Sequence, residues 1–180
     1  MGNAADNLVK KYPDRISQLK GPILAYFKKW AKIKPFNGTE QDLYMTVFHP
    51  VSRQVPPDTV FPANVRKDNP GIKTPQDYIN LVNGKKNTAI LTPAEWTALK
   101  DTASKLGTSS TALYKLINFE SSWAPQARNP ISGARGLIQW MPFVAKEYGF
   151  KDDLGGMTPP LLLALLLGGG YFIARRYGLI

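Results

Sequence analysis

The sequence predicts an all-α fold, a mostly helical single domain followed by a C-terminal transmembrane helix. Helix-capping patterns recur along the chain, as in the run from Thr92 to Glu95, where a threonine precedes a proline and an acidic residue. No segment shows a convincing alternation of apolar and polar residues, which is the pattern of a half-buried strand. The segment from Leu154 to Ala174 carries no charged residue.

The first helix is predicted from Pro13 to about Ala31, with a kink at Gly21-Pro22 because proline lacks the N–H group that a helix interior needs. Thr39 precedes a second apolar helix that stops at Pro50. The stretch from Val51 to Gly71 contains Pro56, Pro57, Pro62 and Pro70, and we expect it to be irregular.

The Thr74-Pro75-Gln76-Asp77 run begins a third helix, and Asn83-Gly84 ends it. The helix after Thr92 should end at Gly107. Its inward-facing residues are expected to be Trp96, Leu99, Ala103 and Leu106. Ser109 or Ser110 then caps one more helix.

Glu120 is the most informative residue on that last helix. Leu113, Leu116, Ile117 and Glu120 follow the i, i+3, i+4, i+7 spacing of one helix face, so the carboxyl group should be buried with the leucines. Burial disfavours the charged form of a carboxyl group and raises its pKa. A carboxylic acid that keeps its proton near neutral pH is what a general acid needs to break a glycosidic bond.

The chain has 180 residues, no cysteine, and a formal net charge of +10 from 23 basic and 13 acidic residues. Absence of cysteine excludes disulfides, thiolate metal sites and cysteine nucleophiles. A basic surface favours polyanions such as nucleic acid, anionic lipid headgroups or the acidic polymers of a bacterial wall, although it can also be simply a solvated surface. Because the basic residues are scattered and do not alternate with aromatic residues, nucleic acid is not an expected partner.

The apolar tail, residues 157–180, is interpreted as a membrane anchor that follows the domain of residues 1–156. A spanning helix needs about 20 apolar residues, and the leucine-rich run followed by Arg175, Arg176 and Tyr177 has just enough. The alternative is a buried core helix, because the densest apolar stretch is short.

The run from Phe119 to Gly149 resembles the catalytic core of lytic transglycosylases of the SLT type, which are relatives of goose-type lysozyme. The matching residues are Glu120-Ser121, Trp123, Pro125, Ala127, Asn129-Pro130, Ser132-Gly133-Ala134, Gly136-Leu137, Gln139 and Met141-Pro142. So many matched positions at the family spacing make the resemblance specific, and it implies a lysozyme-like fold.

Two N-terminal segments also resemble this family, in a different order. Residues 15–27 and 42–50 are similar to segments that phage-borne members carry after the Gly-Leu-x-Gln motif, whereas here they precede it. The resemblance therefore implies a circularly permuted domain. Permutation is tolerated when the original chain ends lie close together at the surface.

The resemblance implies cleavage of the β-1,4 bond between N-acetylmuramic acid and N-acetylglucosamine in peptidoglycan. Glu120 would protonate the leaving oxygen and then act as base on the sugar's own 6-hydroxyl, forming a 1,6-anhydro ring. That mechanism needs one carboxylate, whereas hydrolysis with inversion needs a second one to activate water. Asp42, Asp58 and Asp68 are the residues that the sequence offers for the second role.

The remaining substrate-binding roles are also implied by the resemblance. Ser121 and Gln139 would hydrogen-bond the sugar or its acetamide, Met141 would line the subsite, and the Gly133–Gly136 turn would let the backbone approach the glycan. Ser132, which precedes this turn, is included among the substrate-binding residues. Tyr44 and His49 are included as substrate-side residues, since Phe48-His49-Pro50 falls where family members place a tyrosine that touches the catalytic acid. His49 would then hydrogen-bond Glu120.

Three places in the motif keep a simple structural alternative. Turn chemistry is the alternative for Ser132-Gly133 and the preferred interpretation for Asn129-Pro130, and core packing is preferred for Trp123. Trp140 is left open between the core and the glycan. No metal site is expected, because Lys67 to Ile72 lacks the spaced acids of a calcium loop. No cofactor is expected either.

The leading interpretation is a membrane-anchored lytic transglycosylase, located in the virion membrane of a phage or in a bacterial envelope. Its expected partners are peptidoglycan strands, a lipid membrane and other virion proteins. Two alternatives stay open. One is a hydrolytic muramidase that acts as an endolysin. The other is a non-catalytic structural virion protein that keeps the lysozyme fold for glycan binding.

Overall fold

The computed structural model describes residues 2–152, and this part of the chain is helical, as the sequence predicts. Within it there is no β-strand, only isolated bridges that join Arg128, Arg135 and Trp140. The elements are α1 (Ala4–Lys11), α2 (Arg15–Gln18), the π-helix η1 (Leu19–Ile23), α3 (Leu24–Ile33), α4 (Glu40–Phe48), the 3-10 helix η2 (Pro50–Ser52), α5 (Ala63–Asp68), α6 (Pro75–Gly84), α7 (Pro93–Leu106), α8 (Ser110–Ser121) and α9 (Pro142–Glu147).

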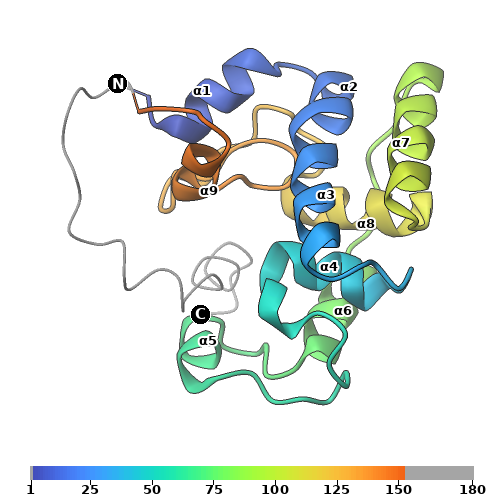
Figure 1. The fold of residues 1–180 in the computed structure, drawn as a ribbon, viewed down its shortest axis with the longest axis vertical. Helices are drawn as coiled ribbons and strands as arrows, with labels where there is room; N and C mark the ends of the chain where they lie inside the picture. The colour runs from blue at the N-terminus through green and yellow to red at the C-terminus, as the bar shows by residue number, and fades with distance from the viewer. Residues whose placement is uncertain (1, 153–180) are drawn as a thin grey trace.

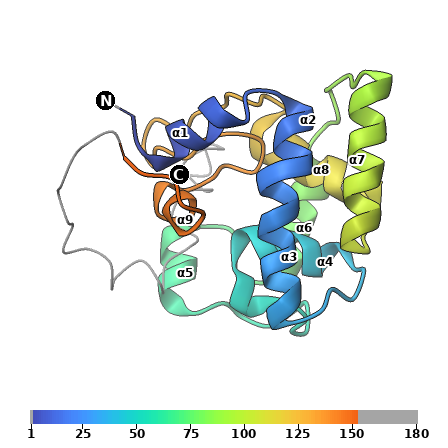
Figure 2. The same cartoon turned by 45° about the horizontal axis from the view of Figure 1, so that its top comes forward.

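The helices pack around α8. Helices α2 and α3 form a rod through the middle of the molecule, α7 runs along one side, and α1 and α9 lie side by side at the other (Figures 1 and 2). Helices α4, α5 and α6 gather at the lower end in Figure 1. Nine of the 12 residues of α8 are buried, so this helix supplies the centre of the core.

The capping patterns read from the sequence are confirmed. The side chains of Thr39, Thr74, Thr92 and Ser109 each accept a hydrogen bond from a backbone N–H in the first turn of α4, α6, α7 and α8. Gly107 ends α7 in the left-handed conformation with φ +65°.

The predicted kink at Gly21-Pro22 is present as the π-helix η1, which contains Pro22. Proline cannot donate the usual helical hydrogen bond, and a local π-turn absorbs that defect. Gly21 is required here for another reason, because a Cβ at this position would lie 2.7 Å from Cε1 of Tyr12. The rod therefore changes pitch without breaking.

Three local predictions differ from the structure. Residues 51–71 are not wholly irregular, since η2 and α5 lie in or at the edge of this stretch and Val65 anchors α5 in the core. Trp96 does not face inward; it is 38% exposed and stacks on Tyr114. Helix α1 was not predicted, yet it buries Leu8 and Val9.

Helix α1 depends on contacts that local sequence does not reveal. Asn3 and Asp6 form a capping box at its start. The backbone N–H of Ala4 donates to the Asp152 carboxylate at 2.9 Å, and the side chain of Asn7 donates to the carbonyl oxygen of Lys151 at 2.8 Å. The two ends of the described chain are thus joined by hydrogen bonds.

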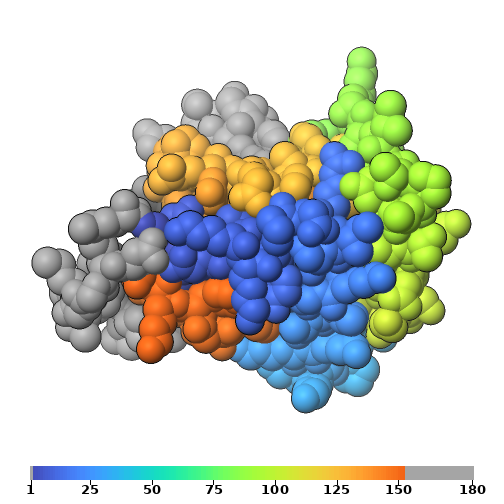
Figure 3. All heavy atoms as spheres, turned by 90° about the horizontal axis from the view of Figure 1, so that it is seen from above, coloured from blue at the N-terminus to red at the C-terminus, as the bar shows by residue number. Residues whose placement is uncertain are grey.

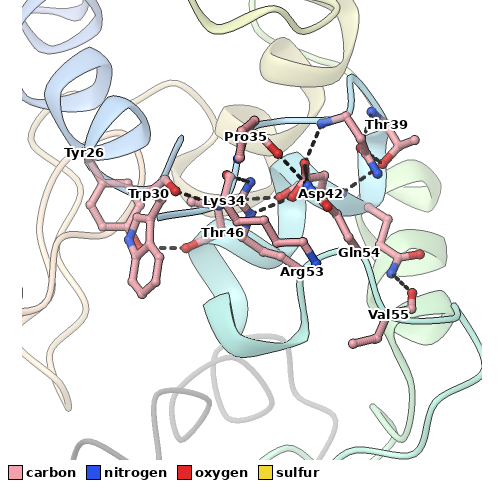
Figure 4. Close-up of polar contacts among 12 residues, drawn as sticks. Tyr26, Trp30, Lys34, Pro35, Thr39, Asp42, Thr46, Arg53, Gln54 and Val55 are labelled. Carbon is pink, nitrogen blue, oxygen red and sulfur yellow. Dashed lines mark hydrogen bonds and ion pairs between the residues drawn. The ribbon is translucent and has the colours of Figure 1, made fainter. Parts of the chain in front are cut away.

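A buried ion pair fastens the turn after α3 to α4 (Figure 4). Nε of Arg53 lies 2.6 Å from Oδ1 of Asp42, and both side chains are at most 3% exposed. The other guanidinium nitrogens of Arg53 donate to the carbonyl oxygens of Trp30 and Lys34. Oδ2 of Asp42 accepts from Gln54 at 2.7 Å and from the backbone of Asn37 at 2.8 Å. Every polar group of the pair has a partner, as a buried charge requires.

Within residues 2–152, no helix has the length and apolar character to cross a membrane. The predicted transmembrane anchor, residues 157–180, and the predicted domain boundary at residue 156 lie outside the described residues.

Candidate active site

Glu120 lies one residue before the end of α8, where the hydrophobic stripe of that helix places it. Ser109 caps the helix, and Leu113, Leu116 and Ile117 are fully buried on the same face. Glu120 itself is 3% exposed, so the prediction that its carboxyl group is buried is confirmed. Its Oε1 atom accepts a hydrogen bond of 2.8 Å from the hydroxyl of Tyr78.

Tyr78 is fully buried on α6, and aromatic neighbours fix its ring. Phe48 stacks on it with ring centroids 4.4 Å apart and an interplanar angle of 20°. Phe119 meets the ring edge-on, at 5.5 Å and 86°. Because the ring is held by packing on two sides, its hydroxyl is directed at the carboxyl of Glu120 before any ligand arrives.

Sequence reasoning missed Tyr78. It expected the tyrosine that touches the acid at Phe48-His49-Pro50 and proposed His49 as a substitute. In the structure the hydroxyl of Tyr78, on α6, donates a hydrogen bond to Glu120. The available signal was the spacing of Tyr78 and Val82, four residues apart on the buried face of α6.

His49 has a different environment from the predicted one. Its Nδ1 lies 2.7 Å from Oγ of Ser52, and its ring meets Phe61 edge-on at 5.4 Å. Burial lowers the pKa of His49 below its ordinary value of 6.5. The imidazole is therefore a neutral part of the α4–η2 corner, which also supports Phe48 beside Tyr78.

Tyr44 is also in the core, fully buried, with its hydroxyl 3.5 Å from the side-chain oxygen of Asn83. Burial, together with the nearby Glu40, raises the pKa of Tyr44 far above its usual range. The structure thus gives Tyr44 a packing role between α4 and α6, and shows no exposed surface of it for a glycan.

The C-terminal end of α8 turns sharply after the catalytic candidate. The hydroxyl of Ser121 donates to the carbonyl of Ile117 at 3.1 Å, so its proton stays within the helix and only its oxygen lone pairs face elsewhere. Ser122 and Trp123 have φ values of +52° and +63°, conformations that are uncommon for residues other than glycine. Lys85 donates to the Phe119 carbonyl at 3.1 Å, as a cation at a helix C-terminus does.

The two tryptophans of the motif are core residues. Trp123 is fully buried, and its Nε1 donates to the carbonyl of Tyr114 at 3.2 Å, which confirms the packing interpretation. Trp140 is 2% exposed and meets Tyr26 edge-on at 5.3 Å. Neither ring presents a face for stacking on a sugar.

The turn at Asn129 is built by its own side chain. Oδ1 of Asn129 accepts from the backbone of Ile131 and Ser132, at 3.0 and 3.1 Å, which is the turn chemistry expected of this residue. The Ser132 hydroxyl accepts from the backbone N–H of Ala134 at 3.2 Å. Gly133 has φ +69°, and a Cβ there would lie 2.7 Å from the side-chain nitrogen of Asn3. These contacts give Ser132 and Gly133 a structural reason that is independent of a glycan.

Gln139 and Met141 keep partly exposed side chains. The amide nitrogen of Gln139 donates to the carbonyl of Gly136 at 2.9 Å, and its φ is +53°. Met141 is the N-cap residue of α9. Of the predicted substrate-binding residues, Ser132 is partly exposed as well, whereas Ser121, Tyr44 and His49 are buried.

The structure bears on one of the acids that the sequence offers for a second catalytic role. Asp42 is tied to Arg53 and Gln54, so it is not free to activate water. In residues 2–152, no group of three or more histidine and acidic side chains is arranged to hold a metal ion. The buried carboxyl group of Glu120 can take part in proton transfer.

Comparison with known protein families gives one match. Residues 98–161 match the model of the transglycosylase SLT domain. This segment is similar to the SLT domain of lytic transglycosylases. It starts within α7, contains Glu120 at the end of α8 and the whole loop to α9, and ends beyond the described residues. No curated protein and no solved structure matches the chain. The SLT domain supports an enzyme that acts on peptidoglycan.

Proposed function

We propose that this protein is a lytic transglycosylase that cleaves the N-acetylmuramic acid–β-1,4–N-acetylglucosamine bond and forms a 1,6-anhydro product. The observation that carries the proposal is the buried carboxyl of Glu120, held by Tyr78 within the SLT-type segment. Burial of an acid costs free energy, which favours a functional role for Glu120 at the centre of the SLT-type segment.

The proposed reaction uses one carboxyl group twice. Protonated Glu120 gives its proton to the bridging oxygen, and the bond from C1 of the muramic acid residue to that oxygen breaks. The resulting carboxylate then accepts the proton of the 6-hydroxyl while the oxygen of that hydroxyl bonds to C1. Glu120 regains its proton, and no water is consumed.

Tyr78 supports both steps by holding the carboxyl group in one orientation. The 2.8 Å hydrogen bond from the Tyr78 hydroxyl to Oε1 fixes the plane of the carboxyl group, so that the group meets the substrate in one geometry. Gln139 and Met141 are proposed to contact the sugars, and the lone pairs of Ser121 to accept from an acetamide N–H. Positions Ser132, Gly133, Tyr44 and His49 are proposed to act through the shape of the site.

The test is digestion of purified peptidoglycan by the full chain, with mass spectrometry of the fragments. Glu120→Gln removes the acid and keeps the shape, and Glu147→Gln is the matched control, since Glu147 is an exposed residue paired with Lys29. We expect products lighter by one water than hydrolytic muropeptides from wild type and control, and none from Glu120→Gln. Hydrated products would establish a muramidase instead. Absence of cleavage by the folded wild-type protein would favour the structural virion protein.

We further propose that the domain is circularly permuted relative to its family. The hydrogen bonds from Ala4 to Asp152 and from Asn7 to Lys151 support this, because permutation needs chain ends that meet. A chain in which residue 152 is linked to residue 2 by a short Gly-Ser linker, with new ends between α6 and α7, should fold and cleave glycan. Failure of that chain to fold would remove the proposal.

We also propose that residues 157–180 anchor the enzyme in the membrane of a phage particle. The uncharged leucine-rich sequence and the flanking arginines support the anchor. The similarity of residues 15–27 and 42–50 to phage-borne family members supports the source. Mass spectrometry of purified, detergent-washed particles tests the location, and absence of the protein from every particle fraction would exclude it.

A further inference from the structure

The segment from Asn3 to Gln18 lies against the loop between α8 and α9, which follows Glu120. In Figure 3, the blue N-terminal segment is placed between the yellow-orange loop and the orange segment of α9. Arg15 donates to the carbonyl of Trp123 at 2.8 Å, and Asp6 pairs with Arg135 at 2.7 Å. The N-terminal segment thus holds this loop at its start, Trp123, and in its second half, Arg135.

Gln18 makes the most central of these contacts. It is fully buried on α2, and its amide nitrogen donates to the carbonyls of Pro125 at 2.7 Å and Tyr12 at 3.0 Å. Its Oε1 accepts from the backbone N–H of Leu137 at 2.9 Å. One side chain therefore joins Pro125 at the start of the loop, Leu137 in its second half and Tyr12 in the N-terminal segment.

The contact is tight on the side of the loop that carries the substrate-binding candidates. A Cβ at Gly136 would lie 2.7 Å from Oε1 of Gln18, and Gly136 has φ +78°. Gly136 also accepts the side-chain hydrogen bond of Gln139. The position of the Gln139 amide is thus set through Gly136 and Leu137 by the Gln18 oxygen.

The backbone at Gln139 needs such support. A non-glycine residue at φ +53° occupies an unfavourable region and stays there only when its surroundings over-determine it. Two backbone bonds between Arg135 and Trp140, at 3.0 and 2.7 Å, close the loop on itself. They fix its internal shape, and Gln18 ties that shape to α2 and to Pro125 at the start of the loop.

We propose that Gln18 is a positioning residue that places the Gly136–Met141 segment for glycan binding. This inference rests on the proposed function, because it assigns Gln18 to the substrate side of the Glu120 site. Gln18 touches neither Glu120 nor Tyr78 in any hydrogen bond, so its loss should weaken substrate binding and leave the proton-transfer chemistry unchanged. A residue needed only for stability would instead lower the fraction of folded protein.

The variant is Gln18→Met in the full chain, which keeps the length of the side chain and removes all three hydrogen bonds. Gln126→Met is the matched control. Its amide also joins the loop to the N-terminal segment, through Pro13 at 2.9 Å, but it is exposed and makes no side-chain bond to residues 136–139. Both variants are compared for KM, kcat and the pH profile on soluble glycan strands, and for amide hydrogen exchange.

For Gln18→Met we expect a KM raised by about tenfold to a hundredfold, the loss associated with a misplaced binding group. The pH profile should keep its shape, and amide exchange should accelerate at residues 134–140 but not in α7. Gln126→Met should stay within about twofold of wild type in KM. If Gln18→Met does not fold, Gln18→Leu replaces it, since leucine is a smaller neutral side chain that removes the same three hydrogen bonds.

An unchanged KM together with unchanged exchange at residues 134–140 would overturn the inference. Equal acceleration of exchange in the loop and in α7 would overturn it too, because that pattern reports a global loss of stability. A wild-type protein that cleaves no glycan would defeat the proposed function alone. In that case the exchange measurement still decides whether Gln18 places the loop.

Discussion

The buried pair of Asp42 and Arg53 yields a prediction about stability that can be worked from its contacts. In Asp42→Asn, one oxygen remains, and an NH₂ group replaces the other. If the remaining oxygen faces Arg53, the NH₂ meets the donors of Gln54 and Asn37. If it faces those donors, the bond to Arg53 is lost. In both orientations, the guanidinium keeps its charge without a neutralising partner.

The expected cost is about 3–5 kcal/mol of unfolding free energy, the range measured when one member of a buried pair is removed. This loss is a large share of the total unfolding free energy of a native domain, which is roughly 5–15 kcal/mol. The assay is urea unfolding at neutral pH, followed by tryptophan fluorescence. Asp101→Asn is the control, because Asp101 pairs with Lys105 at 2.7 Å on the exposed surface. It should cost less than about 1 kcal/mol.

The double variant Asp42→Asn/Arg53→Met provides the sharper comparison. Once both members of the pair are neutral, no charge is left buried alone, so the double variant should lose less than the sum of the two single losses. The reasoning is refuted if Asp42→Asn costs no more than Asp101→Asn, or if the single losses simply add. Glycan cleavage per folded molecule should be retained, since none of the hydrogen bonds of this cluster reaches Glu120 or Tyr78.

Three further predictions concern the site and the tail. Tyr78→Phe should lower the cleavage rate by about tenfold to a hundredfold, because it removes one hydrogen bond to a charged group. Tyr44→Phe is the control and should leave the rate unchanged. Equal rates for the two variants would show that the Tyr78 hydroxyl has no role in cleavage. Burial lowers the pKa of His49 from 6.5, so the neutral ring contributes its full stability above pH 6.5 and loses it as the pH falls below that value. His49→Gln should therefore reduce the loss of unfolding free energy below pH 6.5, as measured by urea unfolding at several pH values. The same pH dependence in wild type and His49→Gln would contradict a neutral, buried His49. Leu165→Arg should abolish flotation of the full chain with phospholipid vesicles, since a charge at the centre of a spanning helix costs about 2.5–3.5 kcal/mol, and flotation as strong as that of Leu165→Ile would exclude the anchor.

The sequence predicts the elements whose signals are local. Thr39, Thr74, Thr92 and Ser109 cap their helices by bonding to N–H groups two or three residues away, so their effect needs no knowledge of the fold. The burial of Glu120 is predicted for the same reason, because helical spacing alone puts it on the leucine face.

Local signals fail where a distant part of the chain decides. Trp96 has the spacing of an inward residue, yet Tyr114 offers it a flat ring at the surface, and it stacks there with an interplanar angle of 8°. Helix α1 is short, and an isolated helix of that length is unstable in water. It forms because residues 151 and 152 meet its first turn.

By itself, the sequence determined the helical class, the buried acid and the SLT-type motif, since each depends on residues close together along the chain. Only the tertiary structure decided which residue touches that acid. Tyr78 lies 42 positions from Glu120, and Gln18 lies 119 positions from Leu137. Contacts of this kind arise when helices pack, and no spacing along one helix encodes them. The catalytic candidate was therefore readable from the sequence, whereas its hydrogen-bond partner and the placement of its loop were not.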